Sequence, residues 1–223
     1  FAIVSFQLSQ VPENYTQYLK IFNQMIFDFL KHSSLYSLSS VITKVIAFLL
    51  LSVYARVFSK EEFGAFDYFL SIGGVISIIL TIDITQGVMR YIPEVKGELS
   101  ALKGYISSSL VFIVVSYLTV FIFLVIWLDE IESNVFDSSF DKNIILSFYI
   151  LFFLTALFNF FNVVLRAQLR VKSSAILLVV QATLSAFFSL LFILVLDFGL
   201  LGLVIGLSLS TLLMIVYFLV DLR

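Results

Sequence analysis

The sequence predicts an all-α integral membrane protein built as a bundle of six transmembrane helices. Of its 223 residues, 61% are hydrophobic and only 13% are charged, and the mean hydropathy is +1.11. Soluble chains are about a quarter charged, so this chain has too few polar side chains to cover a particle in water. Its long apolar runs lack the alternation of barrel strands, which favours helices. The bilayer is therefore the expected solvent for most of the chain.

The six predicted spans follow one another along the chain with short connections. A helix needs roughly 20 apolar residues to cross hydrocarbon about 30 Å thick, and the chain supplies that length repeatedly. Together the spans form one predicted unit, residues 34–223. They cover residues 34–57, 65–89, 105–128, 144–165, 173–196 and 199–220. In the last span Gly202, Gly206 and Ser210 extend a GxxxG pattern, which suits a tight helix contact but also arises often by chance in apolar segments.

Residues 1–33 are predicted to be an N-terminal tail that contains an interfacial amphipathic helix. In helical register its apolar and polar residues fall on opposite faces, as in helices that lie along a membrane surface. The apolar face holds Tyr15, Leu19, Phe22, Ile26, Phe29 and Leu30, and the polar face holds Lys20, Gln24, Asp28 and Lys31. The first stretch, FAIVSFQL, has neither a charged start nor a small-residue cleavage site, so it is not interpreted as a signal peptide. Because the chain begins with Phe1, it is expected to be a fragment or an expressed portion of a longer protein.

The distribution of cations predicts the orientation, because Lys and Arg in short loops resist translocation across the membrane. Placing both termini in the cytoplasm puts nine cations inside and three outside, with Lys44 within a span. The inner set is Lys20, Lys31, Arg90, Lys96, Lys103, Arg166, Arg170, Lys172 and Arg223, and the outer set is Arg56, Lys60 and Lys142. The acidic loop from Asp129 to Asp141 then faces outward.

The composition excludes several classes of function. The net charge of −2 leaves no broad basic surface for nucleic acid. The chain has no Cys and one His, so disulfides, thiol catalysis and histidine-based metal sites are excluded. No P-loop, GxSxG or HExxH motif occurs, and no pair of carboxylates has catalytic spacing within one span. We therefore expect neither an enzyme nor a cofactor or metal. With no channel-type ring or filter visible, a secondary transporter or part of one remains.

Two spans carry polar stripes of the same spacing. Asp83, Gln86 and Arg90 in the second span, and Asn159, Asn162 and Arg166 in the fourth, are separated by i, i+3 and i+7. This spacing puts each set on one face of a helix. In the predicted orientation both stripes lie in the cytoplasmic half of the membrane. Ionisable groups there cost at least about 2.5 kcal/mol each on insertion scales, so each calls for a partner, a cavity or a role.

Lys44 and Gln181 add polar groups near the bilayer midplane. Lys44 lies ten residues after Ser34, which is about 15 Å deep at 1.5 Å per residue, and Gln181 lies at a comparable depth in the fifth span. The simplest arrangement that satisfies all these groups is a water-filled cleft open to the cytoplasm. Its predicted walls are the first, second, fourth and fifth spans, with the third span facing lipid.

Structural interpretations of the same residues stay open. Arg90 and Arg166 lie at helix ends and could extend to lipid phosphates. Lys44 and Asp83 could form a buried structural pair. Gln181, Asn159 and Asn162 could instead make hydrogen bonds between helices.

The first two predicted spans carry a family resemblance. The stretch SLYSLSSVITKVIAFLLLSVYARVFSKEEFGAFDYFLSI, from Ser34, resembles the opening of polysaccharide biosynthesis flippases of the O-antigen type, in the superfamily that also contains MATE exporters and the lipid II flippase. In that family a first helix with a buried basic residue ends in an ARxxGxxxFG type of turn. Lys44, Ala55, Arg56, Phe63 and Gly64 match it, with Ser59 where Gly is usual. The further similar stretches are TQGVMRYIPEVKGE at 85–98, LRAQLRVKSSA at 165–175 and DFGLLGLVIG at 197–206.

The resemblance implies the N-terminal lobe of a MATE-like flippase. Such a protein would move an undecaprenyl-pyrophosphate-linked oligosaccharide from the inner to the outer leaflet of a bacterial cytoplasmic membrane. The family has twelve to fourteen helices in two lobes, so a second lobe is an expected partner, besides membrane lipids and the lipid-linked substrate. Lys44, Arg90 and Arg166 would bind pyrophosphate, with Arg166 at the mouth of the cleft, and Asp83 would couple a proton or sodium ion.

Two alternatives stay open at this stage. A MATE-like drug or cation exporter lobe should have a mainly acidic site, whereas here Asp83 is the single deep acid. A membrane scaffold that does not transport is the other alternative, and the lack of a second lobe is its best support.

Overall fold

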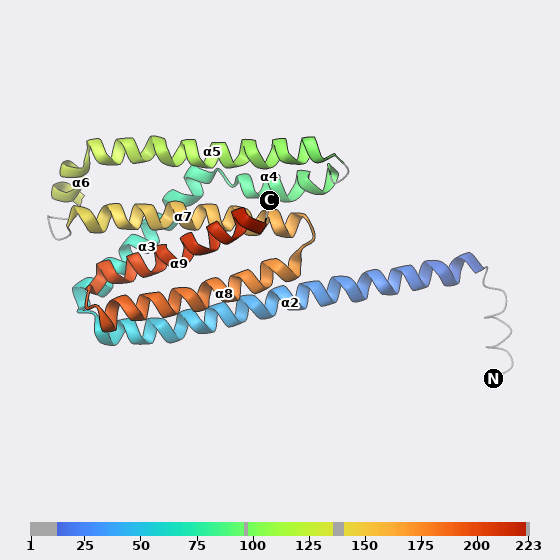
Figure 1. Ribbon diagram of the computed structural model, residues 1–223, viewed down its shortest axis with the longest axis horizontal. Coiled ribbons are helices and arrows are strands. Elements are labelled where there is room, and N and C mark those ends of the chain that lie inside the picture. Colours follow the sequence, from blue (N-terminus) through green and yellow to red (C-terminus); the bar gives the residue numbers. More distant parts are fainter. Residues whose placement is uncertain (1–12, 96–97, 136–140, 222–223) are drawn as a thin grey trace.

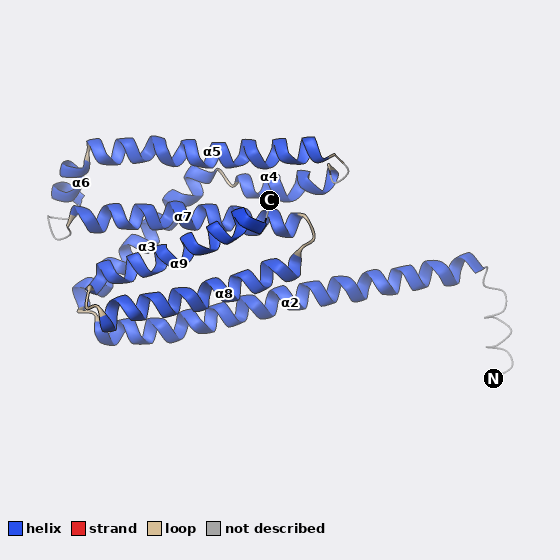
Figure 2. Cartoon of the chain, viewed as in Figure 1, coloured by secondary structure: helices blue, strands red, loops and turns tan. Residues whose placement is uncertain are grey.

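The computed structural model of the protein describes residues 13–95, 98–135 and 141–221, and the described part is helical with short connections (Figures 1 and 2). Residues 1–12 of the predicted tail, together with Lys96, Asp137 and Arg223, lie outside the described residues. The helices are α2 (Glu13–Val57), α3 (Lys60–Thr81), α4 (Ile84–Glu94), α5 (Leu99–Ile126), α6 (Leu128–Val135), α7 (Lys142–Ala167), α8 (Val171–Leu190) with a π-helical turn (Leu191–Val195), and α9 (Gly199–Asp221).

Six of these helices are long and apolar enough to cross a membrane, which confirms the predicted fold class. Each overlaps one predicted span. The six candidate membrane segments are Ser33–Val57, Lys60–Thr81, Ser100–Ile126, Lys142–Ala167, Val171–Val195 and Gly199–Val220. Many of their large apolar side chains are exposed, as expected for a surface that lipid covers.

The first helix, α2, runs for 45 residues without a break. The predicted boundary at residue 33 is therefore not a change of element, because the amphipathic segment and the first span form one helix. At 1.5 Å per residue α2 is about 68 Å long, and its N-terminal part extends past the end of the bundle (Figure 1). The location of this part at a membrane surface stays a prediction.

The second predicted span, 65–89, is wrong as a single helix. The chain leaves the helix at Ile82 and Asp83, whose φ angles of 44° and 48° are left-handed. There the Ile82 N–H donates to the carbonyl of Ile79 at 3.2 Å, and the regular ladder restarts with Gln86 N–H to Asp83 at 2.9 Å. Hydropathy continues across this point, but the local sequence TIDIT is β-branched and polar, and such residues favour a helix weakly.

The start of α3 follows from a capping box at its N-terminus. The Ser59 hydroxyl accepts from the backbone N–H of Glu62 at 3.1 Å, and the Ser59 N–H donates to the Glu62 carboxylate at 3.0 Å. This reciprocal pair satisfies two backbone donors at the helix end. The turn between α2 and α3 is thereby fixed after Phe58, which is buried.

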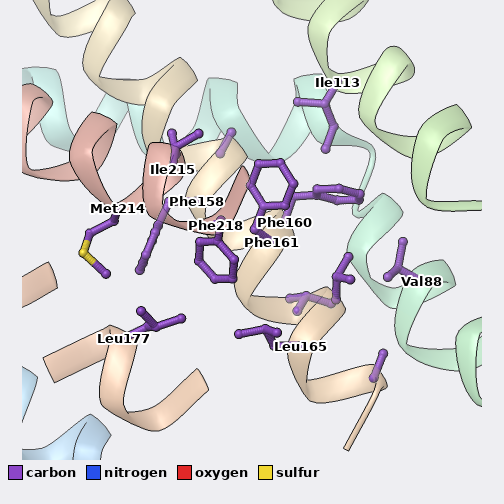
Figure 3. Close-up of a cluster of buried hydrophobic side chains, with 14 of the residues drawn as sticks. Val88, Ile113, Phe158, Phe160, Phe161, Leu165, Leu177, Met214, Ile215 and Phe218 are labelled. Atoms are coloured by element: carbon purple, nitrogen blue, oxygen red, sulfur yellow. The ribbon is translucent and has the colours of Figure 1, made fainter. Parts of the chain in front are cut away.

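The core is centred on α7, which packs against α3, α4, α5, α8 and α9. One buried cluster joins aromatic residues of α7 to Phe218 of α9, and the rings of Phe161 and Phe218 stack at 5.5 Å between centroids (Figure 3). A second cluster lies toward the other end of the bundle, where Phe69 of α3 stacks on Phe148 of α7 at 4.4 Å. Because other helices surround α7, most of its side chains pack against them.

Helices α8 and α9 approach very closely at Gly206. A Cβ atom added there would lie 2.7 Å from the backbone nitrogen of Ser189, and one added at Gly202 would lie 2.9 Å from the carbonyl oxygen of Phe192. Real Cβ atoms do not come this close to backbone. The GxxxG pattern therefore marks a tight helix contact, and that interpretation is confirmed.

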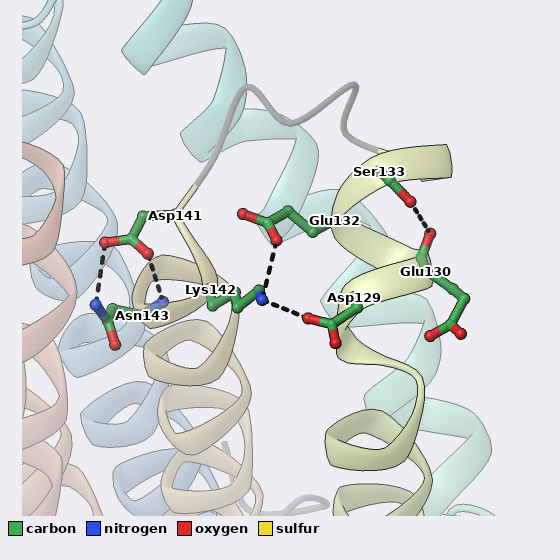
Figure 4. A network of polar contacts seen from close by, with 7 residues as sticks. All are labelled: Asp129, Glu130, Glu132, Ser133, Asp141, Lys142 and Asn143. Carbon is green, nitrogen blue, oxygen red and sulfur yellow. Dashed lines mark hydrogen bonds and ion pairs between the residues drawn. The ribbon is translucent and has the colours of Figure 1, made fainter.

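At the end of the bundle that holds α6, charged residues join α6 to the start of α7 (Figure 4). The Lys142 ammonium forms an ion pair with Asp129 and lies 3.5 Å from a carboxylate oxygen of Glu132. The Asp141 carboxylate accepts from Asn143 and caps α7. Exposed pairs of this kind contribute little to stability.

Candidate functional site

A pocket of about 580 Å³ opens between four helices. Its wall is mostly apolar, and its polar groups come from α2 and α8. The lining residues are Thr43, Lys44, Ile46, Ala47, Phe48, Leu50, Leu51 and Tyr54 of α2, Phe66 and Leu70 of α3, Gln181, Ala182 and Ser185 of α8, and Leu207 of α9. A cavity of this size is typical of small-ligand sites.

Lys44 supplies the charge of this pocket. It is an exposed residue in the middle of the first span, and within the described residues no carboxylate lies within ion-pair distance of it. The described residues that line the pocket include no Asp or Glu. An ammonium group at this depth in a bilayer needs an anionic or polar partner. The pocket is therefore suited to bind an anion.

Hydroxyl and amide groups form a hydrogen-bonded network along one side of the pocket. The Gln181 side-chain amide donates to Ser185 Oγ at 3.0 Å and to Thr211 Oγ1 at 3.4 Å. Ser185 Oγ and Ser210 Oγ are 2.7 Å apart. The network joins α8 to α9 and fixes the Gln181 side chain beside the cavity.

A second polar contact joins α2 to α8 farther along the same face. The hydroxyls of Tyr54 and Ser189 are 2.8 Å apart and buried. Gln181, Ser185 and Ser189 are spaced i, i+4 and i+8, so one face of α8 carries the polar groups that meet α2 and α9. The sequence interpretation found Gln181 but missed Ser185 and Ser189.

The predicted stripe of Asp83, Gln86 and Arg90 does not line this pocket. Asp83 lies in the break before α4, is exposed, and accepts from Thr85 Oγ1 at 3.0 Å. Gln86 and Arg90 are exposed on α4, which packs against α5 and α7. The prediction of one continuous helical stripe is wrong because the helix ends before Asp83.

Arg90 instead contributes to an aromatic contact between α4 and α5. Its guanidinium carbon lies 5.7 Å from the centre of the Tyr91 ring. The Tyr91 ring stacks on Tyr105 at 6.0 Å between centroids. Within the described residues Asp83 and Lys44 form no ion pair, so the structural pair considered above is absent.

The two asparagines of the fourth span have different surroundings. Asn162 is buried, and its amide oxygen accepts from Ser174 Oγ at 2.9 Å while its amide nitrogen donates to the Ser174 carbonyl at 3.3 Å. It therefore joins α7 to α8, as the interhelical interpretation proposed. Asn159 is exposed and does not line the pocket.

The walls of the predicted cleft are corrected accordingly. The pocket lies between the first, second, fifth and sixth spans, because the fourth span packs in the core.

Arg166 lies at the end of α7 and contacts α2. Its guanidinium carbon is 5.0 Å from the centre of the Tyr36 ring, a cation–π distance. Its Nε is buried without a hydrogen-bond partner within the described residues. Tyr36 precedes Lys44 by eight residues, about 12 Å along α2. Arg166 of α7 therefore meets α2 about two helical turns before Lys44.

The arrangement of groups in the pocket is suited to binding. An ammonium and neutral hydrogen-bond donors lie beside an apolar wall, and such a set suits an anionic group attached to an apolar body. Within the described ranges, no three acidic or histidine residues are grouped so as to hold a metal ion.

Comparison with known proteins decides the family. A family model described as "Polysaccharide biosynthesis protein" matches residues 29–223. The chain belongs to this family. The resemblance of the first two spans to polysaccharide biosynthesis proteins is thereby confirmed over nearly the whole chain, and this polysaccharide biosynthesis protein is a multi-pass membrane protein.

One solved structure shares the fold of this polysaccharide biosynthesis protein. It is the outward-facing conformation of a multidrug resistance MATE family transporter of the MOP superfamily, with a TM-score of 0.69 at 16% identity. The match covers 84% of this chain and 44% of that chain, so the polysaccharide biosynthesis protein spans less than half the length of that transporter. No curated protein matched the chain.

Proposed function

We propose that this chain is the N-terminal lobe of a flippase that moves an undecaprenyl-pyrophosphate-linked oligosaccharide across the bacterial cytoplasmic membrane for surface polysaccharide synthesis. Membership of the polysaccharide biosynthesis family supports the cargo class, and the MATE-like fold supports a transporter rather than an enzyme. The match to less than half of a transporter supports a second lobe as the partner that completes the pathway. Both termini lie in the cytoplasm in this proposal.

The position of Lys44 in its pocket is the observation that supports an anionic lipid-linked cargo over a cationic one. A lipid-linked pyrophosphate has several negative charges on an apolar chain, and this pocket offers an unpaired ammonium next to an apolar wall. Lysine binds phosphate as a compact point charge, and Gln181 adds a neutral polar side chain beside it. In a drug or cation exporter we would expect a carboxylate in this pocket to bind the cation. The described lining residues include no carboxylate.

The other predicted site residues have secondary roles in this proposal. Arg166 lies toward the cytoplasmic mouth and would receive the headgroup before Lys44. Arg90, Gln86 and Asn159 are exposed outside the pocket, so they would act only where a second lobe or the glycan reaches them. Asp83 remains the proposed proton or sodium partner, placed at the break between α3 and α4 rather than beside Lys44.

The proposal is tested by flipping in proteoliposomes. The natural full-length product that contains these residues is reconstituted with a fluorescent polyprenyl-pyrophosphate-linked sugar, and the fraction reaching the opposite leaflet is measured by chemical quenching. Because a hydrogen bond to a charged group is worth about 1.5–3 kcal/mol, Lys44→Gln should slow flipping by roughly tenfold or more. Lys44→Arg, which keeps the charge, should retain a larger share of the rate.

A matched control uses Lys60→Gln, which removes a cation at the exposed start of α3, outside the pocket. This variant should flip at the normal rate. Equal rates for Lys44→Gln, Lys60→Gln and the unmodified protein would refute the site. Efflux of a cationic dye without flipping of the lipid would instead favour the exporter.

A further inference from the structure

The N-terminal part of α2 is longer than the membrane requires. The candidate span begins at Ser33, whereas the helix begins at Glu13. If the helix stayed straight, the roughly 20 residues before the span would project about 30 Å from the bilayer, at 1.5 Å per residue. In the structure this part extends past the other helices and is not packed against them (Figure 1).

This projecting part carries large apolar side chains that the bundle does not cover. Phe22, Met25 and Leu30 are 55%, 64% and 58% exposed. In helical register they share one face with Ile26, while Lys20, Gln24 and Lys31 occupy the other and Asn23 lies at the boundary. Phe27 alone departs from this pattern. A helix with such a face is unfavourable in water, so its apolar side needs a nonpolar environment.

Serine residues concentrate where this part meets the span. Ser33, Ser34, Ser37, Ser39 and Ser40 lie within eight residues. Ser34 Oγ donates to the Lys31 carbonyl at 3.1 Å, and Ser39 Oγ to the Tyr36 carbonyl at 2.7 Å. Such side-chain bonds compete with the backbone ladder and favour bending of a helix.

We propose that α2 turns at residues 33–40 and that residues 20–31 bind the cytoplasmic surface of the bilayer. The partner is the lipid surface because these residues directly precede a membrane span, so a turn at the serines brings them to the headgroups. Their apolar face would enter the boundary between headgroups and acyl chains. Lys20 and Lys31 remain on the water-facing side, where the negative potential of anionic lipids attracts them. This proposal does not depend on the cargo.

The lack of cysteine in the sequence allows a direct test. Phe22→Cys, Gln24→Cys and Met25→Cys are each labelled with an environment-sensitive fluorophore in the full chain. The proteins are placed in phosphatidylethanolamine–phosphatidylglycerol vesicles, with or without a shallow nitroxide-labelled lipid. These three neighbouring positions share nearly the same distance from the span, so the polar position 24 is a matched control for both apolar positions.

The expected result is an alternation between neighbouring positions. Labels at 22 and 25 should shift to the blue and be quenched at least twofold by the nitroxide lipid, whereas the label at 24 should respond to aqueous iodide. Aqueous behaviour at all three positions would overturn the proposal, because it means a helix projecting into water. Blue-shifted labels at 22 and 25 that the nitroxide lipid does not quench would also overturn it, because a protein surface then covers the face.

The turn at the serines is tested separately. Ser33, Ser34 and Ser37 are exposed and are replaced together by alanine, while the buried Ser39 is left in place. Lipid quenching of the label at position 25 should fall at least twofold, because the straighter helix lifts away from the surface. Unchanged quenching in this variant would overturn the assignment of the turn to these serines.

Discussion

Leu169 adopts a backbone conformation that glycine adopts more easily. Its φ angle is 63°, and it ends α7 with the two hydrogen bonds of a Schellman motif, from Leu169 N–H to the Arg166 carbonyl and from Arg170 N–H to the Leu165 carbonyl. A left-handed residue other than glycine costs roughly 1–2 kcal/mol, part of which glycine returns as chain entropy. The side chain is exposed, so little packing is lost by removing it.

We therefore expect Leu169→Gly to raise the free energy of unfolding by about 1 kcal/mol. The measurement is the midpoint of thermal unfolding in detergent, which should rise by about 2–4 °C for a chain of this size. Leu169→Ala keeps the strain and serves as the control. A midpoint for Leu169→Gly at or below that of Leu169→Ala would contradict the prediction.

Gly206 and Gly74 provide a matched pair of glycines within the spans. A Cβ at Gly206 would collide with the backbone of α8, whereas a Cβ at Gly74 would meet nothing within 4 Å. Overpacking of this kind costs about 1–3 kcal/mol, so Gly206→Ala should lower the thermal midpoint while Gly74→Ala leaves it nearly unchanged. Equal midpoints for the two variants would show that α8 and α9 can separate without cost.

The polar residues of the candidate site were only partly predictable from the sequence. Lys44 and Gln181 could be singled out because a polar side chain in hydrocarbon is conspicuous in any single span. The sequence could not single out Ser185, Ser210 and Tyr54, because a serine or tyrosine in a span often has no functional role. Only packing reveals which of them meet. The predicted role of Asn159 had the opposite difficulty, since its spacing with Asn162 could not show that one of the two faces outward.

At the scale of helices, α7 and α8 are joined by one buried polar pair. Asn162 and Ser174 make two hydrogen bonds with each other, and both side chains are buried. In a double-mutant cycle of Asn162→Ala and Ser174→Ala, we expect a coupling energy of about 0.6–1.7 kcal/mol, the range found for hydrogen bonds in membrane proteins. Reversible unfolding of the four proteins gives this value. If the changes in unfolding free energy of the two single variants add up to that of the double variant, the pair contributes no coupling energy.

The helices themselves were largely predictable, but their continuity was not. Apolar runs long enough to cross a bilayer gave all six spans to within several residues. Two joins in the structure differ from the expected ones: α2 is one helix across residue 33, and the second span ends at Ile82 where continuity was predicted. Hydropathy measures the preference of a segment for water or hydrocarbon, and it carries almost no information on whether φ and ψ stay helical.

For the whole molecule, the predicted orientation can be tested with cysteine labelling, since the chain has no native thiol. Ser133 on α6 and Ser100 in the first turn of α5 are both exposed, and the length of α5 separates them. In intact cells a membrane-impermeant maleimide should label Ser133→Cys, and Ser100→Cys should react only after the cells are opened. The reverse pattern would invert the topology and place the N-terminal part of α2 outside.

The left-handed residues Ile82 and Asp83 divide one membrane crossing into two rods. The rod before the break, α3, contributes Phe66 and Leu70 to the pocket wall, whereas the rod after it, α4, packs against α5 and α7. The Gly206 contact holds α8 and α9 together. A change of φ or ψ at Ile82 or Asp83 would alter the angle between α3 and α4, and with it the position of Phe66 and Leu70 relative to Lys44.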